Sequence, residues 1–378
     1  MNALHFGAGK IGRGFIGAIL SQAGYNVTFA DVNSSVVSAL NSLNTYSLHI
    51  LDYDASIERV CGVRAVLSDS AVDEIIAADL ITTAVSMNLL PTVAPIVAQG
   101  LVCRRNAGVV APLDIVCCEN GIRATSYFKQ LVFEHLDNQM RCWAEQNVGF
   151  ADGCVDRIVP VVTLENSLDV AVERFYEWCV ERISLKGGLR EIEQVHFVED
   201  IDACVYRKLF TLNTAHCATA YLGALRGYEY IHDAIADKWV QSIVRGVMGE
   251  CSQMLIAHYG LDRVEQERYC NTILSRFANA ALGDTVSRVS RDPMRKLSPQ
   301  MYFSNPINLA IQAGVEVQYL STVVAAALKF RSVNDAQSLQ LGDMIARVGV
   351  AQTVREVCGI TEARVIERIE SAYKEIGD

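Results

Sequence analysis

Residues 3–20 read ALHFGAGKIGRGFIGAIL, and this stretch decides the fold of the first half of the chain. The short apolar run at 3–6 predicts a β-strand, and the apolar spacing over 15–20 predicts a helix. Between them, residues 7–12 match G-x-G-x-x-G. After a strand, the first glycine permits a tight turn, the second lets the main chain approach a pyrophosphate, and the third allows close helix packing. The stretch therefore predicts a dinucleotide-binding loop.

A second predicted strand favours this interpretation over a simple flexible turn. It covers 26–30 and ends at Asp31, close to the expected distance of about twenty residues from the glycine motif. The Asp31 carboxylate is expected to accept hydrogen bonds from ribose hydroxyls. No Lys or Arg lies between Asp31 and Arg59 to bind a 2′-phosphate, which the carboxylate would repel. The pattern predicts NAD rather than NADP; the structural alternative is an aspartate that caps a helix or turn.

Further strand-length runs at 79–85 and 113–118 alternate with amphipathic helical stretches. This alternation predicts an α/β domain with a parallel, doubly wound sheet of the Rossmann type. Ligands of such sheets bind at the carboxyl ends of the strands, so Asn120 is expected beside the reacting centre. The residues predicted to contact the cofactor are Gly7, Ala8, Gly9, Lys10, Ile11, Gly12, Arg13, Asp31, Thr83, Ala84, Val85 and Glu119.

The second half of the chain has a different pattern, which is almost entirely helical from about residue 200. We expect an NAD-binding domain over 1–195, followed by a mainly helical substrate and catalytic domain over 196–378. The helical stretches are expected at 203–224, 231–258, 263–280, 307–330, 335–348 and 361–375.

Composition bounds the class of protein. The 378 residues are 51% hydrophobic and 20% charged, enough for two domains with buried cores. The net charge of -10 disfavours a nucleic-acid or anionic-membrane binder. No signal-like start and no apolar run of roughly 18 residues occur, so a cytoplasmic protein is expected. The twelve cysteines and seven histidines lack the spacing of metal sites or disulfide frameworks, so no metal is predicted and most cysteines are expected to be buried.

The most informative helix reads ACVYRKLFTLNTAHCATAYL over 203–222. At about 100° per residue, an α-helix would place Lys208, Asn213 and His216 near 0°, 140° and 80°, on one face. The other side chains are mostly apolar, so the helix is expected to be buried, and its polar groups then need partners or a cavity. Taken singly, each has a structural alternative: a snorkelling lysine, an asparagine bonded to main chain, or a satisfied core histidine.

These three side chains suit the oxidation of an alcohol by NAD. Such a reaction needs a base for the hydroxyl proton while hydride leaves carbon, and burial favours the neutral, basic form of a lysine. Asn213 is expected to donate a hydrogen bond to the reacting oxygen. His216 is expected to orient the substrate or Lys208. In the reverse direction the lysine acts as the acid.

The spacing Lys208-x4-Asn213-x2-His216 resembles the K-x4-N-x2-H signature of the polyol-specific long-chain dehydrogenases, which use a lysine rather than a metal as base. The chain is similar over essentially its whole length to the short members of that family, the mannitol-1-phosphate 5-dehydrogenases. The motifs that carry the resemblance are FGAGKIGRGFIG at 6–17, CEN at 118–120, VDRIVP at 155–160, RKLFTLNTAH at 207–216 and RDPMRKL at 291–297.

The resemblance implies a reaction and a set of roles. The reaction is the interconversion of D-mannitol 1-phosphate and D-fructose 6-phosphate with NAD. The sequence does not fix the oligomeric state, and either a monomer or a small homo-oligomer is expected. Lys208 would be the general acid/base, and Asn120 and Asn213 would form an oxyanion hole. His216 and Asp156 would bind or orient the polyol. The predicted substrate contacts include Arg157 as well, although without the resemblance Asp156 and Arg157 look like an ordinary strand-end ion pair.

A basic cluster surrounds the turn at Asp292-Pro293. Its members are Arg288, Arg291, Arg295 and Lys296. Arginine and lysine side chains bind phosphate groups, so a phosphorylated substrate makes this cluster the best candidate for a phosphate clamp, with Arg295 and Lys296 first. The structural alternative is a solvated loop.

The chain departs from the pattern of the short family members at Lys10, Tyr206 and Met301-Tyr302. Those members commonly have Asn, Glu and an acidic-basic pair there. Two alternatives stay open: an NAD-dependent dehydrogenase of another polyol, polyol phosphate or sugar acid, and a catalytically silent NAD-binding regulatory protein. The second conflicts with three polar groups on an apolar helix, which are costly to bury without a function.

Overall fold

The computed structural model describes residues 1–52, 54–160, 162–189 and 192–376. The chain divides into two compact units, Met1–Cys204 and Val205–Asp378. Helix α7 (Ile201–Arg207) contains this division, which therefore falls a little after the boundary expected near residue 195.

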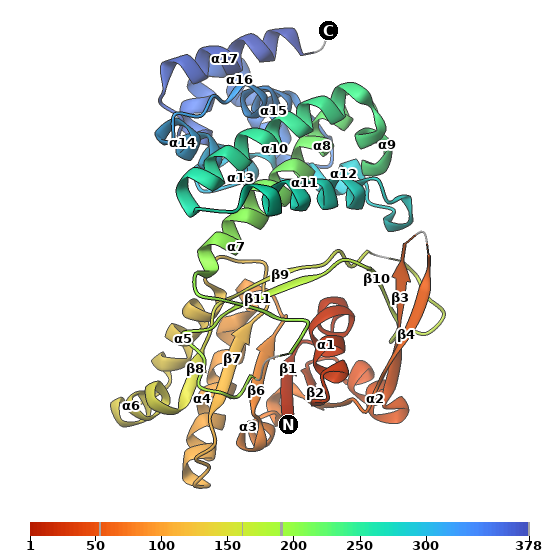
Figure 1. Cartoon of the computed structure of the whole chain (residues 1–378), viewed down its shortest axis with the longest axis vertical. Coiled ribbons are helices and arrows are strands. Elements are labelled where there is room, and N and C mark those ends of the chain that lie inside the picture. Colours follow the sequence, from red (N-terminus) through yellow and green to blue (C-terminus); the bar gives the residue numbers. More distant parts are fainter. Residues whose placement is uncertain (53, 161, 190–191, 377–378) are drawn as a thin grey trace. The chain divides into compact units, whose positions relative to one another are not determined.

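The first unit is built on one six-stranded parallel sheet, in the order β5-β2-β1-β6-β7-β8 (Figure 1). Its strands are β1 (Asn2–Phe6), β2 (Asn26–Asp31), β5 (Arg64–Leu67), β6 (Leu80–Thr83), β7 (Leu113–Cys117) and β8 (Val148–Phe150). The strand order reverses at the central pair of β1 and β6, the switch point at which such sheets bind ligands. The predicted doubly wound α/β fold is confirmed.

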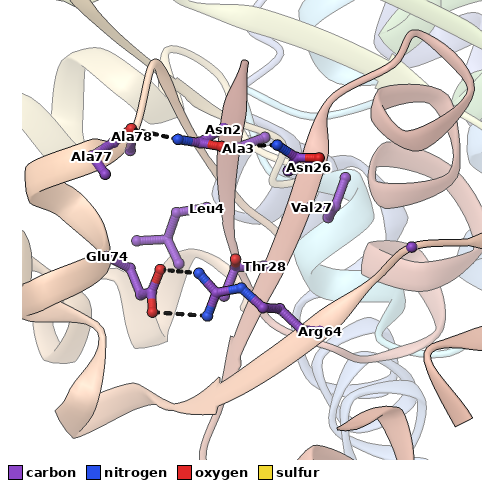
Figure 2. A pocket seen from close by; sticks show the side chains of 11 residues that line it. Asn2, Ala3, Leu4, Asn26, Val27, Thr28, Arg64, Glu74, Ala77 and Ala78 are labelled. Carbon is purple, nitrogen blue, oxygen red and sulfur yellow. Dashed lines mark hydrogen bonds and ion pairs between the residues drawn. The ribbon is translucent and has the colours of Figure 1, made fainter.

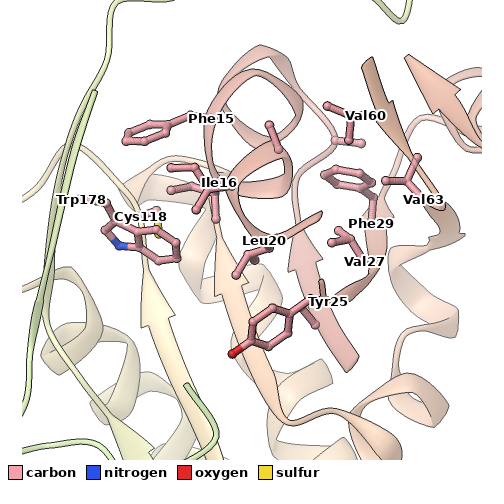
Figure 3. Close-up of a cluster of buried hydrophobic side chains, with 14 of the residues drawn as sticks. Phe15, Ile16, Leu20, Tyr25, Val27, Phe29, Val60, Val63, Cys118 and Trp178 are labelled. Carbon is pink, nitrogen blue, oxygen red and sulfur yellow. The ribbon is translucent and has the colours of Figure 1, made fainter. Parts of the chain in front are cut away.

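Two hydrophobic clusters cover the two faces of this sheet, because successive strand residues point to opposite sides. Ala3 of β1 belongs to one cluster, whereas Leu4 and Phe6 belong to the other. The first cluster packs η1 (Gly12–Ile16), α1 (Gly17–Gln22) and α2 (Ser34–Leu43) on the sheet, and Figure 3 shows part of it around Phe29. The second cluster packs α3 (Val72–Ala77), α4 (Leu90–Asn106), α5 (Ala124–Glu134) and α6 (Asn138–Asn147).

Two small three-stranded sheets complete the first unit. One contains β10 (Val170–Glu173), β3 (Thr45–Leu51) and β4 (Ser56–Cys61), and the other contains β12 (His196–Val198), β11 (Glu177–Glu181) and β9 (Gly153–Asp156). β10 packs against η1, so the first of these sheets supports the segment that follows the glycine loop.

The second unit is helical, as predicted (Figure 1). After α7 come η4 (Lys208–Asn213), α8 (Thr214–Leu225), α9 (Ile231–Ala236), α10 (Lys238–Tyr259), α11 (Arg263–Phe277), α12 (Val286–Val289), α13 (Pro293–Leu297), α14 (Ser304–Gln312), α15 (Gln318–Lys329), α16 (Ala336–Thr353) and α17 (Ala363–Glu375). The centre of the unit is α8, which packs against α9, α10, α12 and α15.

Two of the predicted long helices are wrong as single elements. The stretch 231–258 breaks at Asp237, whose extended main chain ends α9 and whose carboxylate caps the start of α10. The stretch 307–330 breaks after α14, where Gly314 has a φ of +69°. A positive φ interrupts a right-handed helix and favours glycine.

The described residues include no helix that is both long and apolar enough to cross a membrane. Within the same ranges, no group of three or more His, Cys, Asp or Glu residues is arranged to hold a metal ion. The twelve cysteines are free thiols, and seven of them are buried: Cys117, Cys118, Cys154, Cys179, Cys217, Cys251 and Cys358.

Candidate active site

The glycine loop is held tightly on one side and is open on the other. Gly7 has a φ of +101°, and a side chain there would overlap the main chain of Ala84. A Cβ on Gly12 would overlap the carbonyl oxygen of Gly7. At Gly9, by contrast, a Cβ would meet no atom within 4 Å. The loop thus leaves its Gly9 main chain accessible, which is what the approach of a pyrophosphate requires.

Asp31 stands at the end of β2, beside this loop. One carboxylate oxygen accepts from the main-chain N–H of Ala8 at 2.6 Å, and the other accepts from Asn33 at 2.8 Å. Each carboxylate oxygen has a further lone pair for a ribose hydroxyl. The Rossmann domain therefore fits NAD, and the contact of Asp31 with the adenosine ribose stays a prediction.

We expect Asp31→Asn to lower kcat/KM for NADH and to reduce the preference of the protein for NADH over NADPH. The amide keeps the shape but loses the charge that strengthens hydrogen bonds to hydroxyls and repels a 2′-phosphate. The loss for NADH should be about tenfold in kcat/KM, the size of one charge-assisted hydrogen bond. The measurement is kcat/KM for both cofactors, and an unchanged ratio of the two values would rule out this role for Asp31.

Arg13, predicted to contact the cofactor, is buried and already bonded. Its guanidinium donates to the carbonyl oxygens of Ala8 and, at 2.9 Å, of Leu168. Burial lowers the pKa of Arg13, an effect that the nearby Tyr46 and Asp31 oppose. These contacts are those of a residue that holds the glycine loop in shape, so we propose that Arg13 positions the loop.

Glu119 anchors the other predicted cofactor contacts. Its carboxylate accepts from the Thr83 hydroxyl at 2.7 Å and from the Val85 main-chain N–H at 3.0 Å. Burial raises the pKa of Glu119, while these two hydrogen bonds lower it in part. Glu119 thereby fixes the segment 83–85 at the carboxyl ends of β6 and β7. Asn120 follows directly, outside the strand.

His5 was not predicted, yet it lies directly beneath the glycine loop. It is fully buried, its Nδ1 lies 2.7 Å from the Thr82 hydroxyl, and its ring borders Gly12. Burial lowers the pKa of His5 from 6.5 to about 3. The ring is therefore neutral in the folded protein at neutral pH, and nothing in the local sequence distinguishes it from an apolar strand residue.

This burial predicts a loss of stability in acid. The unfolded chain protonates His5 below about pH 6.5, whereas the folded chain resists the proton until about pH 3. The contribution of the neutral ring is complete above pH 6.5 and falls by about 1.4 kcal/mol per pH unit inside that window. Denaturant unfolding from pH 7.5 to 4.5 should be less pH-dependent in His5→Gln, and identical slopes in both proteins would contradict this assignment.

The structure places Asp156 and Arg157 in β9 and just after it. Asp156 is buried and lies opposite Glu177 of β11. The Arg157 guanidinium donates to the carbonyl oxygens of Glu173, at 2.9 and 3.0 Å, and Gly14, at 3.1 Å. The substrate contact of Arg157 stays a prediction, while its observed contacts are those of a packing residue beneath η1.

In the second unit, the predicted catalytic helix contains a π-helical turn, η4, over Lys208–Asn213. The main-chain N–H of Thr214 bonds to the carbonyl of Leu209, five residues back. A uniform α-helix would place Lys208 and Asn213 about 140° apart, but the wider turn brings residues five apart closer to one face. The predicted angle of about 140° between Lys208 and Asn213 is therefore corrected to a smaller one, which places the two residues closer to the same face of the helix. π-Helical turns are often found at functional sites.

Exposure also singles out the predicted residues. From Phe210 to Gly223 every side chain is buried except Asn213 and His216, which are half-buried, as is Lys208 just before them. The two partly exposed side chains of this stretch are thus two of the three predicted catalytic residues.

His216 has a partner that was not predicted. Its Nε2 lies 2.8 Å from a carboxylate oxygen of Asp284, and its ring stacks on Phe277 with centroids 4.9 Å apart. Burial lowers the pKa of His216, an effect that Asp284 opposes. Burial raises the pKa of Asp284, but His216 and Arg288 outweigh it, so this pKa lies below its ordinary value. Asp284 therefore stays ionised and fixes the imidazole.

The basic cluster divides into residues that are already bonded and residues that are accessible. Arg288 is half-exposed and pairs with Asp284 at 2.7 Å. Lys296 is buried, and its ammonium donates to the carbonyl oxygen of Val289. Arg295 is half-exposed, and its guanidinium lies 4.0 Å from Asp292. Of the two residues predicted first as phosphate ligands, Arg295 presents its charge to solvent and Lys296 does not.

The pocket in Figure 2 belongs to a different region of the first unit. It has a volume of about 330 Å³, lies at the amino ends of β1 and β2, and is bordered by the ion pair of Arg64 and Glu74. Ligands of parallel sheets bind at the opposite, carboxyl ends of the strands, so we assign this pocket no role in catalysis.

Comparison with known proteins agrees with this two-unit description. Residues 1–194 match the model of the mannitol dehydrogenase Rossmann domain, and residues 200–377 match that of the mannitol dehydrogenase C-terminal domain. The fold is similar to that of Pseudomonas fluorescens mannitol 2-dehydrogenase, solved as a ternary complex with NAD and D-mannitol. That comparison gives 19% identity and a TM-score of 0.75, and covers 99% of this chain and 91% of the other.

A D-sorbitol dehydrogenase in substrate-free form is also similar, with 19% identity, a TM-score of 0.83, and coverage of 99% of this chain and 92% of the other. At these identities the two structures establish the fold, whereas the two domain models together cover nearly every residue. The chain therefore belongs to the mannitol dehydrogenase family.

Proposed function

We propose that this protein is an NAD-dependent oxidoreductase that interconverts D-mannitol 1-phosphate and D-fructose 6-phosphate without a metal, with Lys208 as general acid/base. The observation that carries the proposal is the composition of the second unit's polar site. Asn213 and His216 are the two partly exposed side chains between Phe210 and Gly223, and Arg288 pairs with Asp284, the partner of His216. An alcohol that reacts at one end and carries an anionic group at the other needs polar side chains such as Asn213 and His216 for the reaction and arginines for the anionic group.

The cofactor side is supported by the open loop at Gly9, by Asp31, and by the segment 83–85 that Glu119 anchors. The NAD complex of the Pseudomonas fluorescens enzyme, which shares this fold, supports the same cofactor here. Bound NAD supplies the hydride acceptor for alcohol oxidation and, as NADH, the donor for ketone reduction.

The protein's own residues handle the proton and the developing charge. In the oxidative direction Lys208 takes the hydroxyl proton of the substrate and releases it to solvent, and in reduction it returns a proton to the carbonyl oxygen. Asn213 donates a hydrogen bond to that oxygen, where negative charge builds up. His216, held by Asp284, orients the polyol hydroxyls. Arg295 binds the phosphate through its exposed guanidinium.

The test is NADH oxidation by the purified protein, followed by absorbance, with fructose 6-phosphate or fructose as substrate. We expect turnover that requires the phosphate, prefers NADH to NADPH and survives a chelator. Equal turnover of fructose would favour a dehydrogenase of unphosphorylated polyols. Binding of NADH with no turnover of either sugar would show that the proposed substrate is wrong.

A further inference from the structure

The π-helical turn that contains Lys208 and Asn213 is joined to another helix through the hydroxyl group of Thr211. Thr211 is fully buried, and its hydroxyl oxygen accepts a hydrogen bond from the side-chain amide of Gln266, at 2.9 Å. Gln266 belongs to α11 and lies 55 residues further along the chain. The contact is therefore tertiary, and it connects the turn to a separate helix of the same unit.

The amide of Gln266 is itself fixed in place. Its side chain is buried, and its nitrogen also donates to the hydroxyl of Ser252 on α10, at 3.0 Å. An amide nitrogen carries two N–H groups, one for each of the two hydroxyls. A buried amide that leaves such partners loses its hydrogen bonds without gaining contact with water, so its displacement is costly. Gln266 therefore ties the turn to both α10 and α11.

The two residues just before the turn contact the same pair of helices. The ring of Tyr206 stacks on that of Tyr259, the last residue of α10, with centroids 5.1 Å apart. The guanidinium of Arg207 lies over the ring of Tyr269 on α11, 4.6 Å from its centroid. Stacking and cation–π contacts are directional, so they fix the direction in which the chain enters Lys208.

We propose that Gln266 is a positioning residue for the reaction, because its hydrogen bond to Thr211 sets the orientation of the π-helical turn. Thr211 lies between Lys208 and Asn213 in the turn, so a rotation of Thr211 about the helix axis moves both. A general acid/base must lie within hydrogen-bond reach of the proton that it transfers, so a small displacement lowers the rate. The proposal rests on the proposed function, because it takes Lys208 as the acid/base.

The test is Thr211→Val, which removes the hydroxyl and nearly keeps the shape of the side chain. We expect kcat for the reduction of fructose 6-phosphate to fall about fivefold, the size of one neutral hydrogen bond, with little change in KM or NADH affinity. The pH profile of kcat should shift, because the surroundings of Lys208 change. Thr211→Ser keeps the hydroxyl and should keep the wild-type kcat and profile.

Thr219→Val is the matched control for Thr211→Val. Thr219 is equally buried, and its hydroxyl donates to the carbonyl oxygen of Ala215 in its own helix α8, at 2.8 Å. The same substitution there should leave kcat and its pH profile unchanged. A loss of kcat in Thr219→Val as large as that in Thr211→Val would overturn the proposal, because any buried threonine would then have the same effect.

A double-mutant cycle assigns the effect to the contact between Gln266 and Thr211. Gln266→Met removes the amide and should reproduce the loss of kcat seen in Thr211→Val. In the Thr211→Val background it should lower kcat little further, because the hydrogen bond is already absent. If both single variants only melt at a lower temperature and keep the wild-type kcat and pH profile, the contact is purely structural and the proposal is wrong.

Failure of the proposed function gives a different result. A wild type that turns over neither sugar defeats the substrate assignment, and the surroundings of Lys208 are then measured directly. The measurement is the rate at which acetic anhydride acetylates Lys208, relative to the exposed Lys238, by mass spectrometry of the peptides. This relative rate should change in Thr211→Val and return to the wild-type value in Thr211→Ser. Equal relative rates in the wild type and Thr211→Val would overturn the positioning role.

Discussion

Replacing Lys208 with Ala is expected to lower kcat by about 10²- to 10⁴-fold, the usual contribution of a positioned general acid/base. Lys208 is the first residue of the π-helical turn and is half-buried. Its replacement by Ala removes the proton acceptor, while the surrounding helix keeps its apolar packing. NADH binding should be retained, because the glycine loop and Asp31 belong to the other unit. Steady-state kinetics and a fluorescence titration with NADH measure the two properties.

Two controls make the Lys208 result specific. Lys238→Ala removes an exposed lysine at the start of α10 and should leave kcat unchanged. A small primary amine added to Lys208→Ala should restore part of the activity, because it supplies the missing base. Activity within tenfold of the wild type would exclude Lys208 as the acid/base, and loss of NADH binding would show that the substitution acts through folding.

The fold of the first unit was predictable because its signals are local. The glycine spacing, the strand before it and Asp31 all lie within 31 residues, and each keeps its predicted place. The strand expected over 79–85 is shorter, since it ends at Thr83. Beyond that point the main chain of Val85 bonds to Glu119 instead of to a neighbouring strand. Such a contact between distant residues leaves no mark in the strand's own sequence.

The sequence predicted which residues could form the candidate site, but it did not predict their geometry. The K-x4-N-x2-H spacing includes Asn213 and His216, the two partly exposed side chains between Phe210 and Gly223. The angles calculated for a uniform α-helix, however, missed the π-helical turn. That turn is closed by Thr214, whose hydroxyl also bonds the carbonyl of Tyr302, 88 residues away. Local propensity does not contain this contact between distant residues, so the sequence alone could not predict it.

The charge pattern of the sequence did not distinguish buried basic residues from exposed ones. Arg295 and Lys296 are adjacent and looked equivalent as phosphate ligands. The fold turns Lys296 inward to the carbonyl of Val289 and leaves Arg295 half-exposed. Asp284 was overlooked, although its position four residues before Arg288 is the spacing of a helical ion pair. Its pairing with His216, in contrast, joins the loop before α12 to α8 and required the structure.

Asn213 is the residue whose loss should most clearly separate catalysis from binding. If its amide donates to the reacting oxygen, Asn213→Ala should lower kcat by about 10²- to 10³-fold, the usual cost of removing one oxyanion donor. KM for the ketose should change little, because a hydrogen bond that strengthens as charge develops contributes mainly to the transition state. NADH affinity should be unaffected. Steady-state kinetics in the reductive direction give both parameters.

A pair of further variants decides between this role and a structural one. Asn213→Asp keeps the shape of the side chain but replaces its N–H donors with oxygen, so it should be as inactive as Asn213→Ala while melting near the wild-type temperature. Asn271→Ala, at an exposed position of α11, is the matched control and should keep full activity. If Asn213→Ala raises KM and leaves kcat unchanged, Asn213 binds the substrate in its ground state and is not the oxyanion donor. The charge on the reacting oxygen must then be stabilised by another group, for which Asn120, in the loop after β7, is the first candidate.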